Sequence, residues 1–128
     1  LVGLNWVGND LVINGNFATD SDWVKESDWT ISGGLANCNS IGTQGSRSLK
    51  QSSLLTIGVT YLLEVDIVNY QSGSPKLFDG VSNTTIGAAD GRFSIEFTAG
   101  SVDLTFNGVD GFVGSIGNVL IKRILEAP

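Results

Sequence analysis

The stretch RFSIEFTAGSVDLTFN, residues 92–107, decides the fold class of this chain. Its apolar side chains stand on every second residue, first at Phe93, Ile95 and Phe97 and then at Val102, Leu104 and Phe106. This spacing indicates two strands with one buried face each, because successive side chains of a strand point to opposite faces. Ala99-Gly100 separates the two runs, so we expect an antiparallel hairpin here.

The same alternation continues outward from this stretch. Thr60–Tyr70 repeats it, with one face made of Tyr61, Leu63, Val65 and Ile67. No window shows the 3.6-residue apolar period of a helix. Shorter strands are expected at Leu11–Asn14, Trp29–Ser32, Leu35–Asn39, Ser48–Ser53, Lys76–Phe78, Thr84–Ile86 and Gly117–Ile124. Many short strands separated by glycine-containing turns are typical of a sandwich or barrel.

We therefore predict one all-β domain over residues 11–128, a two-sheet antiparallel β-sandwich of jelly-roll type. The alternating apolar side chains of the two stretches above are expected to fill its interior, and Trp29 and Cys38 are expected to be buried with them. The glycine-rich segment Gly111–Gly117 is expected to be a loop. Residues 1–10 are expected to form an N-terminal arm or a connection to a preceding segment.

The composition excludes much chemistry. The chain has 128 residues, no histidine, no methionine and one cysteine. It can form no internal disulfide, cysteine–histidine dyad or multi-cysteine zinc site, and we expect neither a cofactor nor a bound metal. The net charge of −6 argues against nucleic acid and membranes as partners. Because the chain has no methionine and opens on Leu1, we expect it to be a processed product or a piece of a longer polypeptide.

Glu64 and Asp66 are the best-spaced pair of carboxylates. Residues two apart on a strand share one face and lie roughly 7 Å from each other, near the separation that an inverting glycosidase uses. The simpler interpretation is a solvated outer face, since nothing places either carboxylate in an apolar pocket that would raise its pKa. We therefore expect a protein that is not an enzyme.

Two aromatic residues are candidates for stacking on a sugar ring. Trp23 lies in an expected loop, and Tyr70 ends the polar face of the longest strand. Packing at the edge of the core is the alternative for each of them. The polar side chains expected to hydrogen-bond a polyhydroxylated ligand are Gln51, Glu64, Asp66, Asn69 and Arg92.

Several motifs follow one another in an order known from one protein family: Asn14-Gly15-Asn16-Phe17, Trp23, Trp29–Gly34, Gln51, Gly58–Tyr61 and Ile116–Ile121. From Asp10 to Ile124 the chain resembles the jelly-roll carbohydrate-binding modules of families 4 and 9. It is most similar to the versions within bacteriophage virion proteins, such as tail fibres and capsid-surface proteins. In that family, acidic residues after the Asn-Gly-x-Phe run and in the closing strand help hold a structural calcium ion. Ala18 and Gly117 stand at those positions here, so the resemblance implies that this calcium is absent or weakly bound.

The resemblance implies a non-catalytic structural module of a virus particle, which decorates the capsid or forms part of a tail or fibre. Its expected partners are other virion subunits, in a homo-oligomer or multi-copy assembly, and surface polysaccharide bound weakly through many copies. Its expected location is the virion or the extracellular space. The apolar residues of the arm are expected to pack on a neighbouring subunit: Leu1, Val2, Leu4, Trp6 and Val7.

Two other functions remain open. The first is a carbohydrate-binding module that is either free or attached to an enzyme. The second is a small glycosidase that uses Glu64 and Asp66.

Overall fold

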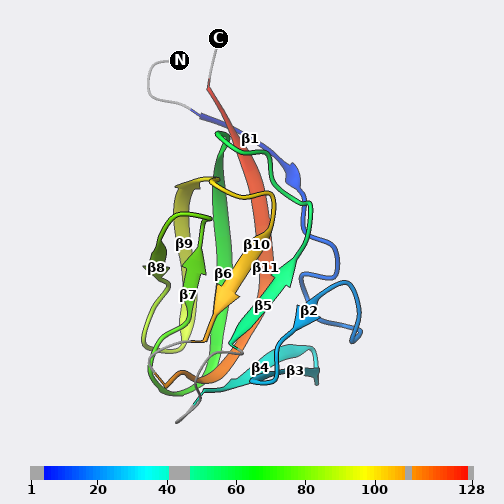
Figure 1. The fold of residues 1–128 in the computed structure, drawn as a ribbon, viewed down its shortest axis with the longest axis vertical. Helices are drawn as coiled ribbons and strands as arrows, with labels where there is room; N and C mark the ends of the chain where they lie inside the picture. The colour runs from blue at the N-terminus through cyan, green and yellow to red at the C-terminus, as the bar shows by residue number, and fades with distance from the viewer. Residues whose placement is uncertain (1–4, 41–46, 109–110, 127–128) are drawn as a thin grey trace.

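Two antiparallel sheets lie face to face in this computed structural model, which describes residues 5–40, 47–108 and 111–126 and, for 5–7 and 125–126, the backbone alone (Figure 1). The six-stranded sheet has the order β3-β4-β11-β6-β9, and β1 pairs with β11 beside this path. Its strands are β1 (Asn5–Asp10), β3 (Trp29–Ser32), β4 (Leu35–Asn39), β6 (Thr60–Ser72), β9 (Gly91–Thr98) and β11 (Val113–Glu126). The five-stranded sheet has the order β2-β5-β10-β7-β8. Its strands are β2 (Val24–Lys25), β5 (Ser48–Gln51), β7 (Lys76–Phe78), β8 (Asn83–Thr85) and β10 (Leu104–Asn107).

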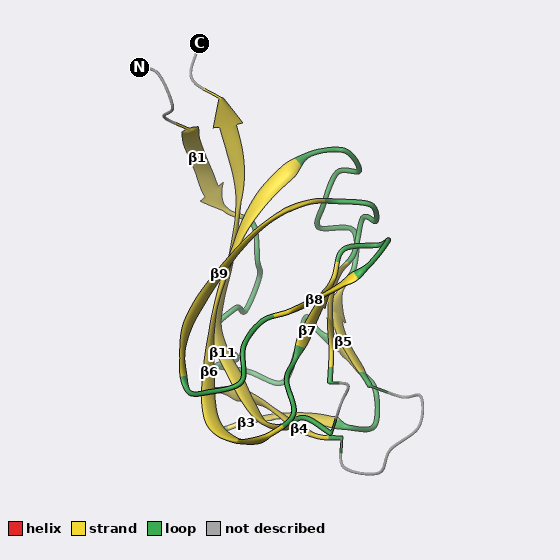
Figure 2. Ribbon diagram, turned by 90° about the vertical axis from the view of Figure 1, so that its left-hand side faces the viewer, coloured by secondary structure: helices red, strands yellow, loops and turns green. Residues whose placement is uncertain are grey.

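The connections make the sandwich a jelly-roll. Only β3–β4 and β7–β8 are consecutive strands that pair within a sheet, and every other connection crosses from one sheet to the other. A side view separates the two layers, with β9, β6 and β11 in one and β5, β7 and β8 in the other (Figure 2). The structure thus confirms the predicted two-sheet antiparallel β-sandwich.

The predicted hairpin at Ala99-Gly100 is wrong. The strand before it, β9, belongs to the six-stranded sheet, and the strand after it, β10, belongs to the other. The Ala99 N–H donates to the Val59 carbonyl at 2.9 Å, and the Gly100 N–H donates to the Asp79 carbonyl at 2.7 Å. Because the crossover uses these backbone groups, it breaks the alternation of the sequence, and Val102 is exposed instead of buried.

The core lies between the inner faces of the two sheets. The predicted face of β6 is buried there, and so are Phe97, Leu104 and Phe106. Each such large apolar side chain contributes roughly 1.5–3 kcal/mol of burial free energy. Phe93 and Ile95 differ from the prediction, because they are only half-buried on the strand that ends the six-stranded sheet.

Trp23 and Trp29 both belong to the core. The Trp23 indole is 7% exposed, and its ring centroid lies 5.2 Å from that of Phe17 and 6.2 Å from that of Phe106. Its Nε1–H donates to the Asn14 carbonyl at 3.0 Å. Of the two interpretations of Trp23, the structure thus agrees with packing in the core and not with an exposed ring, and the predicted burial of Trp29 is confirmed.

Near both ends of the chain, the strands begin and end at other residues than the sequence predicts. Asn5–Asp10 forms β1, which pairs with β11 from Asn5↔Glu126 onward, so this part of the predicted arm is a sheet strand. Leu11–Asn14 is not a strand, because its backbone turns at Asn14, where φ is 55°. Most of the predicted loop Gly111–Gly117 is the beginning of β11. The predicted subunit contacts of Leu1, Val2 and Leu4 lie outside the described residues, and those of Trp6 and Val7 stay a prediction.

Candidate functional site

Three of the predicted ligand residues meet on the outer face of the six-stranded sheet. Register places Asp66 of β6 opposite Arg92 of β9, with Glu64 two residues along β6 on the same face. An Arg92 Nη1–H donates to Asp66 Oδ1 at 2.9 Å, and Arg92 Nε lies 3.8 Å from Glu64 Oε2. The two predicted carboxylates thus share one guanidinium.

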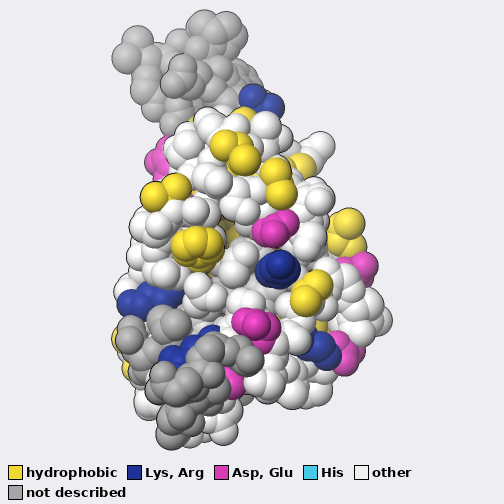
Figure 3. Space-filling view, viewed as in Figure 1, with side chains coloured by type: hydrophobic (Ala, Val, Ile, Leu, Met, Phe, Trp, Pro, Cys, Tyr) yellow, Lys and Arg dark blue, Asp and Glu magenta, His cyan; other side chains and the backbone are white. Residues whose placement is uncertain are grey.

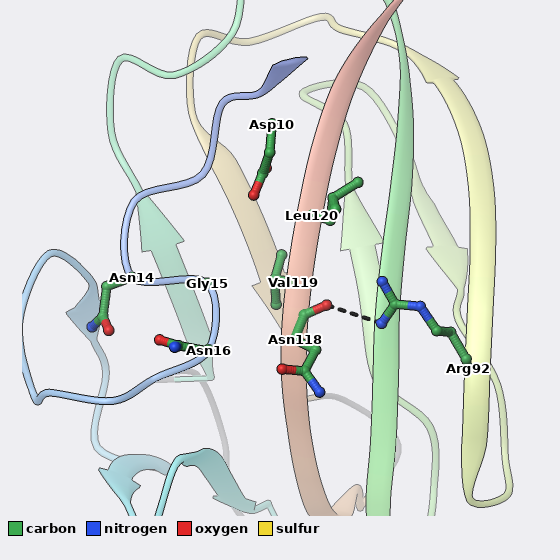
Figure 4. A pocket seen from close by; sticks show the side chains of 8 residues that line it. All are labelled: Asp10, Asn14, Gly15, Asn16, Arg92, Asn118, Val119 and Leu120. Atoms are coloured by element: carbon green, nitrogen blue, oxygen red, sulfur yellow. Dashed lines mark hydrogen bonds between the residues drawn. The ribbon is translucent and has the colours of Figure 1, made fainter. Parts of the chain in front are cut away.

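Asn118 of β11 completes this polar cluster. Its Nδ2–H donates to Asp66 Oδ2 at 2.7 Å, and its carbonyl accepts a hydrogen bond from Arg92 Nη1 at 3.0 Å (Figure 4). The register of β11 shifts between Gly117 and Leu120, and Asn118 has a φ of 47°. Asparagine tolerates this left-handed conformation better than most residues. Sequence reasoning missed Asn118, because a bulge inside a long strand leaves no break in the pattern.

The electrostatics of the cluster favour the ionised form of the Asp66 carboxylate. Partial burial of Asp66 would raise the pKa of its carboxyl group, but the hydrogen bonds from Asn118 and Arg92 and the Arg92 charge together hold that pKa below its usual value. A general acid needs the opposite shift. The geometry therefore suits a structural ion-pair network across three strands better than glycoside hydrolysis.

A shallow cavity of about 400 Å³ adjoins this cluster. One wall is the bulge of β11 and the Arg92 side chain, and the other wall is the loop of Asn14, Gly15 and Asn16 (Figure 4). The Val119 N–H donates to the Gly15 carbonyl at 2.8 Å, which holds the loop against β11. In the described part of the chain, no three histidine, cysteine, aspartate or glutamate side chains gather in a way that could hold a metal ion.

Gln51 is a structural residue rather than a ligand contact. Its side chain is 5% exposed. It accepts a hydrogen bond from the Ile13 N–H at 3.0 Å, and it donates to the carbonyls of Ile13 at 2.8 Å and Asp22 at 3.3 Å. These bonds attach the 11–23 segment to β5. Gln51 and the buried Trp23 are therefore both unavailable to a sugar at the surface, contrary to the expectation.

Tyr70 and Asn69 lie beyond the last β6–β9 pair, Ile67↔Gly91, and so beyond the Arg92 cluster. The Tyr70 ring is half-buried, and its hydroxyl donates to the Gly73 carbonyl at 2.8 Å. Asn69 is exposed and has a φ of 54°. The structure thus brings Glu64, Asp66 and Arg92 together and leaves the other predicted residues apart from them.

A second surface is the outer face of the five-stranded sheet, which faces the viewer in Figure 3. We call it the Phe78 face. Strand pairing sets its outward side chains in two cross-strand rows: Val24, Lys50, Thr105, Phe78 and Asn83 form one row, and Ser48, Asn107, Lys76 and Thr85 form the other. Phe78 is half-exposed on this surface, on the strand next to the edge strand β8.

Polar groups surround the Phe78 ring. Thr105 lies opposite it on β10, and Asn83 lies opposite it on β8. The Asn107 Nδ2–H donates to Asn83 Oδ1 at 2.9 Å, which fixes both amides beside the ring. Lys50 Nζ lies 3.8 Å from Asp103 Oδ2 on the same face. Figure 3 shows apolar, basic and acidic groups interspersed over this surface.

Sequence reasoning placed Lys76–Phe78 in a strand but did not single out Phe78. The signal was available in the alternation, because a buried Leu77 turns both of its neighbours outward. An aromatic side chain directed away from the core of a sandwich is then a candidate for ligand contact.

The class of protein that these layers define is the antiparallel β-sandwich. No family model matches the chain, and no curated protein matches it. One solved structure to which it is similar is the N-terminal endo-1,4-β-D-xylanase 10B of Clostridium thermocellum, with its CBM22-1 and GH10 modules complexed with xylohexaose. The TM-score is 0.38 and the identity 16%, over 99% of this chain and 29% of that chain. A similarity this low assigns no ligand. No helix in the described residues is long and apolar enough to cross a membrane.

Proposed function

We propose that this chain is a non-catalytic carbohydrate-binding module whose ligand lies on the Phe78 face. The observation that carries the proposal is a half-exposed phenylalanine on the outer face of a sheet. A hydroxyl and an amide lie opposite it on the two neighbouring strands, and the Lys50 ammonium belongs to the next strand, β5. An aromatic ring packs against the C–H face of a sugar, while such polar groups exchange hydrogen bonds with its hydroxyls. The resemblance to carbohydrate-binding modules agrees with this assignment.

The polar groups determine the class of sugar that we expect. Asn83 and Asn107 each keep capacity for hydrogen bonds beyond the one that they share, because an amide offers two donors and two lone pairs. Lys50 and Lys76 bring positive charges to this face, and Asp103, 3.8 Å from Lys50, brings a negative one, so its net charge is small. A neutral oligosaccharide fits such a surface better than a polyanionic one.

The carboxylate pair supports the non-catalytic part of the proposal. Glu64 and Asp66 lie on the other sheet, and both contact Arg92. The lowered pKa of Asp66 makes it a poor proton donor at neutral pH. Hydrolysis of a bound glycan by this chain would contradict this part of the proposal. If the hydrolytic activity survived in the Glu64→Gln and Asp66→Asn variants, the catalytic site would lie away from these two carboxylates.

The test is a glycan array followed by titration of the best neutral oligosaccharide into the purified chain. Phe78→Ala is expected to weaken binding about tenfold to a hundredfold, since loss of an aromatic stacking contact removes roughly 1–3 kcal/mol. Tyr70→Ala is the matched control, because it truncates a half-buried aromatic residue on the other sheet and should leave binding unchanged.

Two results would overturn the proposal. No signal above background on a broad array rules out glycan binding. Binding that is lost in Tyr70→Ala but retained in Phe78→Ala moves the site to the end of β6 that sequence reasoning favoured.

The wider setting is a separate proposal: the chain is a structural module of a virus particle, located in the virion or outside the cell, with other virion subunits as partners. Its support is the ordered set of sequence motifs alone. The test is light scattering of the full natural polypeptide. Large regular assemblies support a place in a particle, and polypeptides that stay unassembled contradict it.

A further inference from the structure

The strand β9 ends the six-stranded sheet with an unusually long free edge. The other strands that end the two sheets are short: β2 has two residues, β8 has three and β3 has four, whereas β9 has eight. The side strand β1 has a register shift between Val7 and Asp10, but β9 pairs with β6 without interruption. Natural sheets blunt their edges with short strands, bulges, proline or charged side chains. The strand β9 is long and has neither a bulge nor a proline, and its two charged residues, Arg92 and Glu96, carry opposite charges.

The side chains of β9 are also incompletely covered. Phe93 and Ile95 point toward the core layer but remain half-exposed, while Phe97 further along the strand is buried. In the described part of the chain, no other strand pairs with the outer edge of β9. An additional strand at this edge would pair with the free backbone groups and cover both apolar side chains.

We propose that a second copy of this chain binds here, β9 against β9 in antiparallel orientation, around a two-fold axis at Ser94. In this register Phe93 lies opposite Ile95 of the other copy, and the same contact occurs twice. Each copy then covers the exposed apolar surface of the other. The inference is independent of glycan binding, because β9 lies outside the Phe78 face.

Charge favours this register over the one centred on Phe93. With Ser94 on the axis, Arg92 of each copy faces the strand position of Glu96 of the other, so opposite charges lie across the new pair. A register centred on Phe93 sets Glu96 opposite Asp90, which brings like charges together. The Arg92 guanidinium leans over β6 toward Asn118, so the attraction acts between neighbouring charges and not through a close ion pair.

The predicted dimer has a definite geometry. A two-fold axis perpendicular to the joined sheet keeps both five-stranded sheets on the same side of it. The two Phe78 faces then point in the same direction, which allows both to bind one extended ligand. One strand pair makes a small interface, so we expect a dissociation constant of about 10–100 μM.

Cross-linking tests the register directly. Ser94 is exposed and meets its own copy on the axis, where opposite α-carbons of an antiparallel pair lie about 4.5–5.5 Å apart, within the range of a disulfide. Ser94→Cys is therefore expected to give a covalent dimer on mild oxidation. Glu96→Cys is the matched control and should not, because position 96 faces position 92. The buried Cys38 does not compete in either variant.

Light scattering of the unaltered chain over a concentration series tests the association itself. We expect a reversible dimer that Glu96→Arg weakens at least about tenfold, since it sets two like-charge pairs across the axis. Thr30→Arg adds the same side chain to β3 at the opposite edge of the sheet and should leave the dimer intact. A chain that stays monomeric at about 0.5 mM, well above the expected dissociation constant, overturns the proposal. So does a dimer in which Ser94→Cys fails to cross-link.

Discussion

At Gly108 the backbone passes directly over the Cys38 side chain. A Cβ atom added to Gly108 would lie 2.4 Å from Cys38 Sγ and 2.7 Å from Ser40 Oγ. Burial of this thiol raises the pKa of Cys38 to about 11, despite its contact with the Ser40 hydroxyl. Cys38 is therefore an uncharged packing residue at neutral pH, as its place in a strand predicted.

This close approach predicts a specific coupling between two substitutions. Gly108→Ala should lower the free energy of unfolding by about 1–3 kcal/mol, because the added methyl group overpacks the core at the sulfur atom. In a Cys38→Ala background the same change should cost less, since the sulfur is gone and only the Ser40 hydroxyl still crowds the added methyl group. Urea unfolding of the two single variants and the double variant measures the coupling. Equal costs in both backgrounds would show that the sulfur does not limit the space.

On the scale of elements, the 11–23 segment shows what the alternation of apolar residues does not predict. Leu11–Asn14 alternates like a strand, yet the segment turns at Asn14 and follows the open edge of the sandwich. Its contacts include groups distant in sequence, the Gln51 amide and the Val119 N–H. Alternation predicts which face of a strand is buried, but it carries no information on such distant partners.

Gln51 is expected to hold this segment in place. Gln51→Leu keeps the size of the side chain but leaves the Ile13 N–H and carbonyl without their partners, at a cost of about 1–3 kcal/mol. Gln71→Leu is the control, because Gln71 is exposed on β6. Thermal unfolding should show a clear loss of stability in the first variant and little change in the second. A neutral Gln51→Leu variant would mean that water replaces the lost hydrogen bonds.

The Arg92 cluster ties β6, β9 and β11 together, and it should make their stability depend on pH. The pKa of Asp66 is lowered in the folded state, so its contribution is present above the ordinary value of 3.8 and is lost as the pH falls through the folded-state pKa. Asp66→Asn should cost about 0.5–1 kcal/mol at pH 7, an amount limited by the solvent exposure of the ion pair.

The difference between wild type and Asp66→Asn is then expected to shrink at pH 3. Urea unfolding at the two pH values measures it. Glu96→Gln serves as the control, because Glu96 makes no hydrogen bond or ion pair with the described residues. A difference that persists unchanged at low pH would show that the Asp66 charge contributes nothing to stability.

On the scale of the whole molecule, the fold class follows from the alternating stretches, while the assignment of strands to sheets does not. The hydrophobic pattern marks β6 and β9 as strands with one buried face. The pattern does not show whether the chain turns back or crosses over after Thr98, since either path buries Leu104 and Phe106. Glu64, Asp66 and Arg92 were predictable as neighbours only in part, because their meeting depends on the β6–β9 register.

The pairing of β1 with β11 determines how the sandwich carries mechanical load. Asn5 and Glu126 pair at one end of this ladder, and β1 runs from there toward Asp10. A force that separates the two ends acts across the strands, so it breaks the backbone hydrogen bonds one after another, as in unzipping. The first firm resistance comes at Asp10, whose Oδ1 accepts hydrogen bonds from Val12 and Ile121 at 3.1 and 3.0 Å. Under tension β1 therefore peels away as a short extensible tether before either sheet opens.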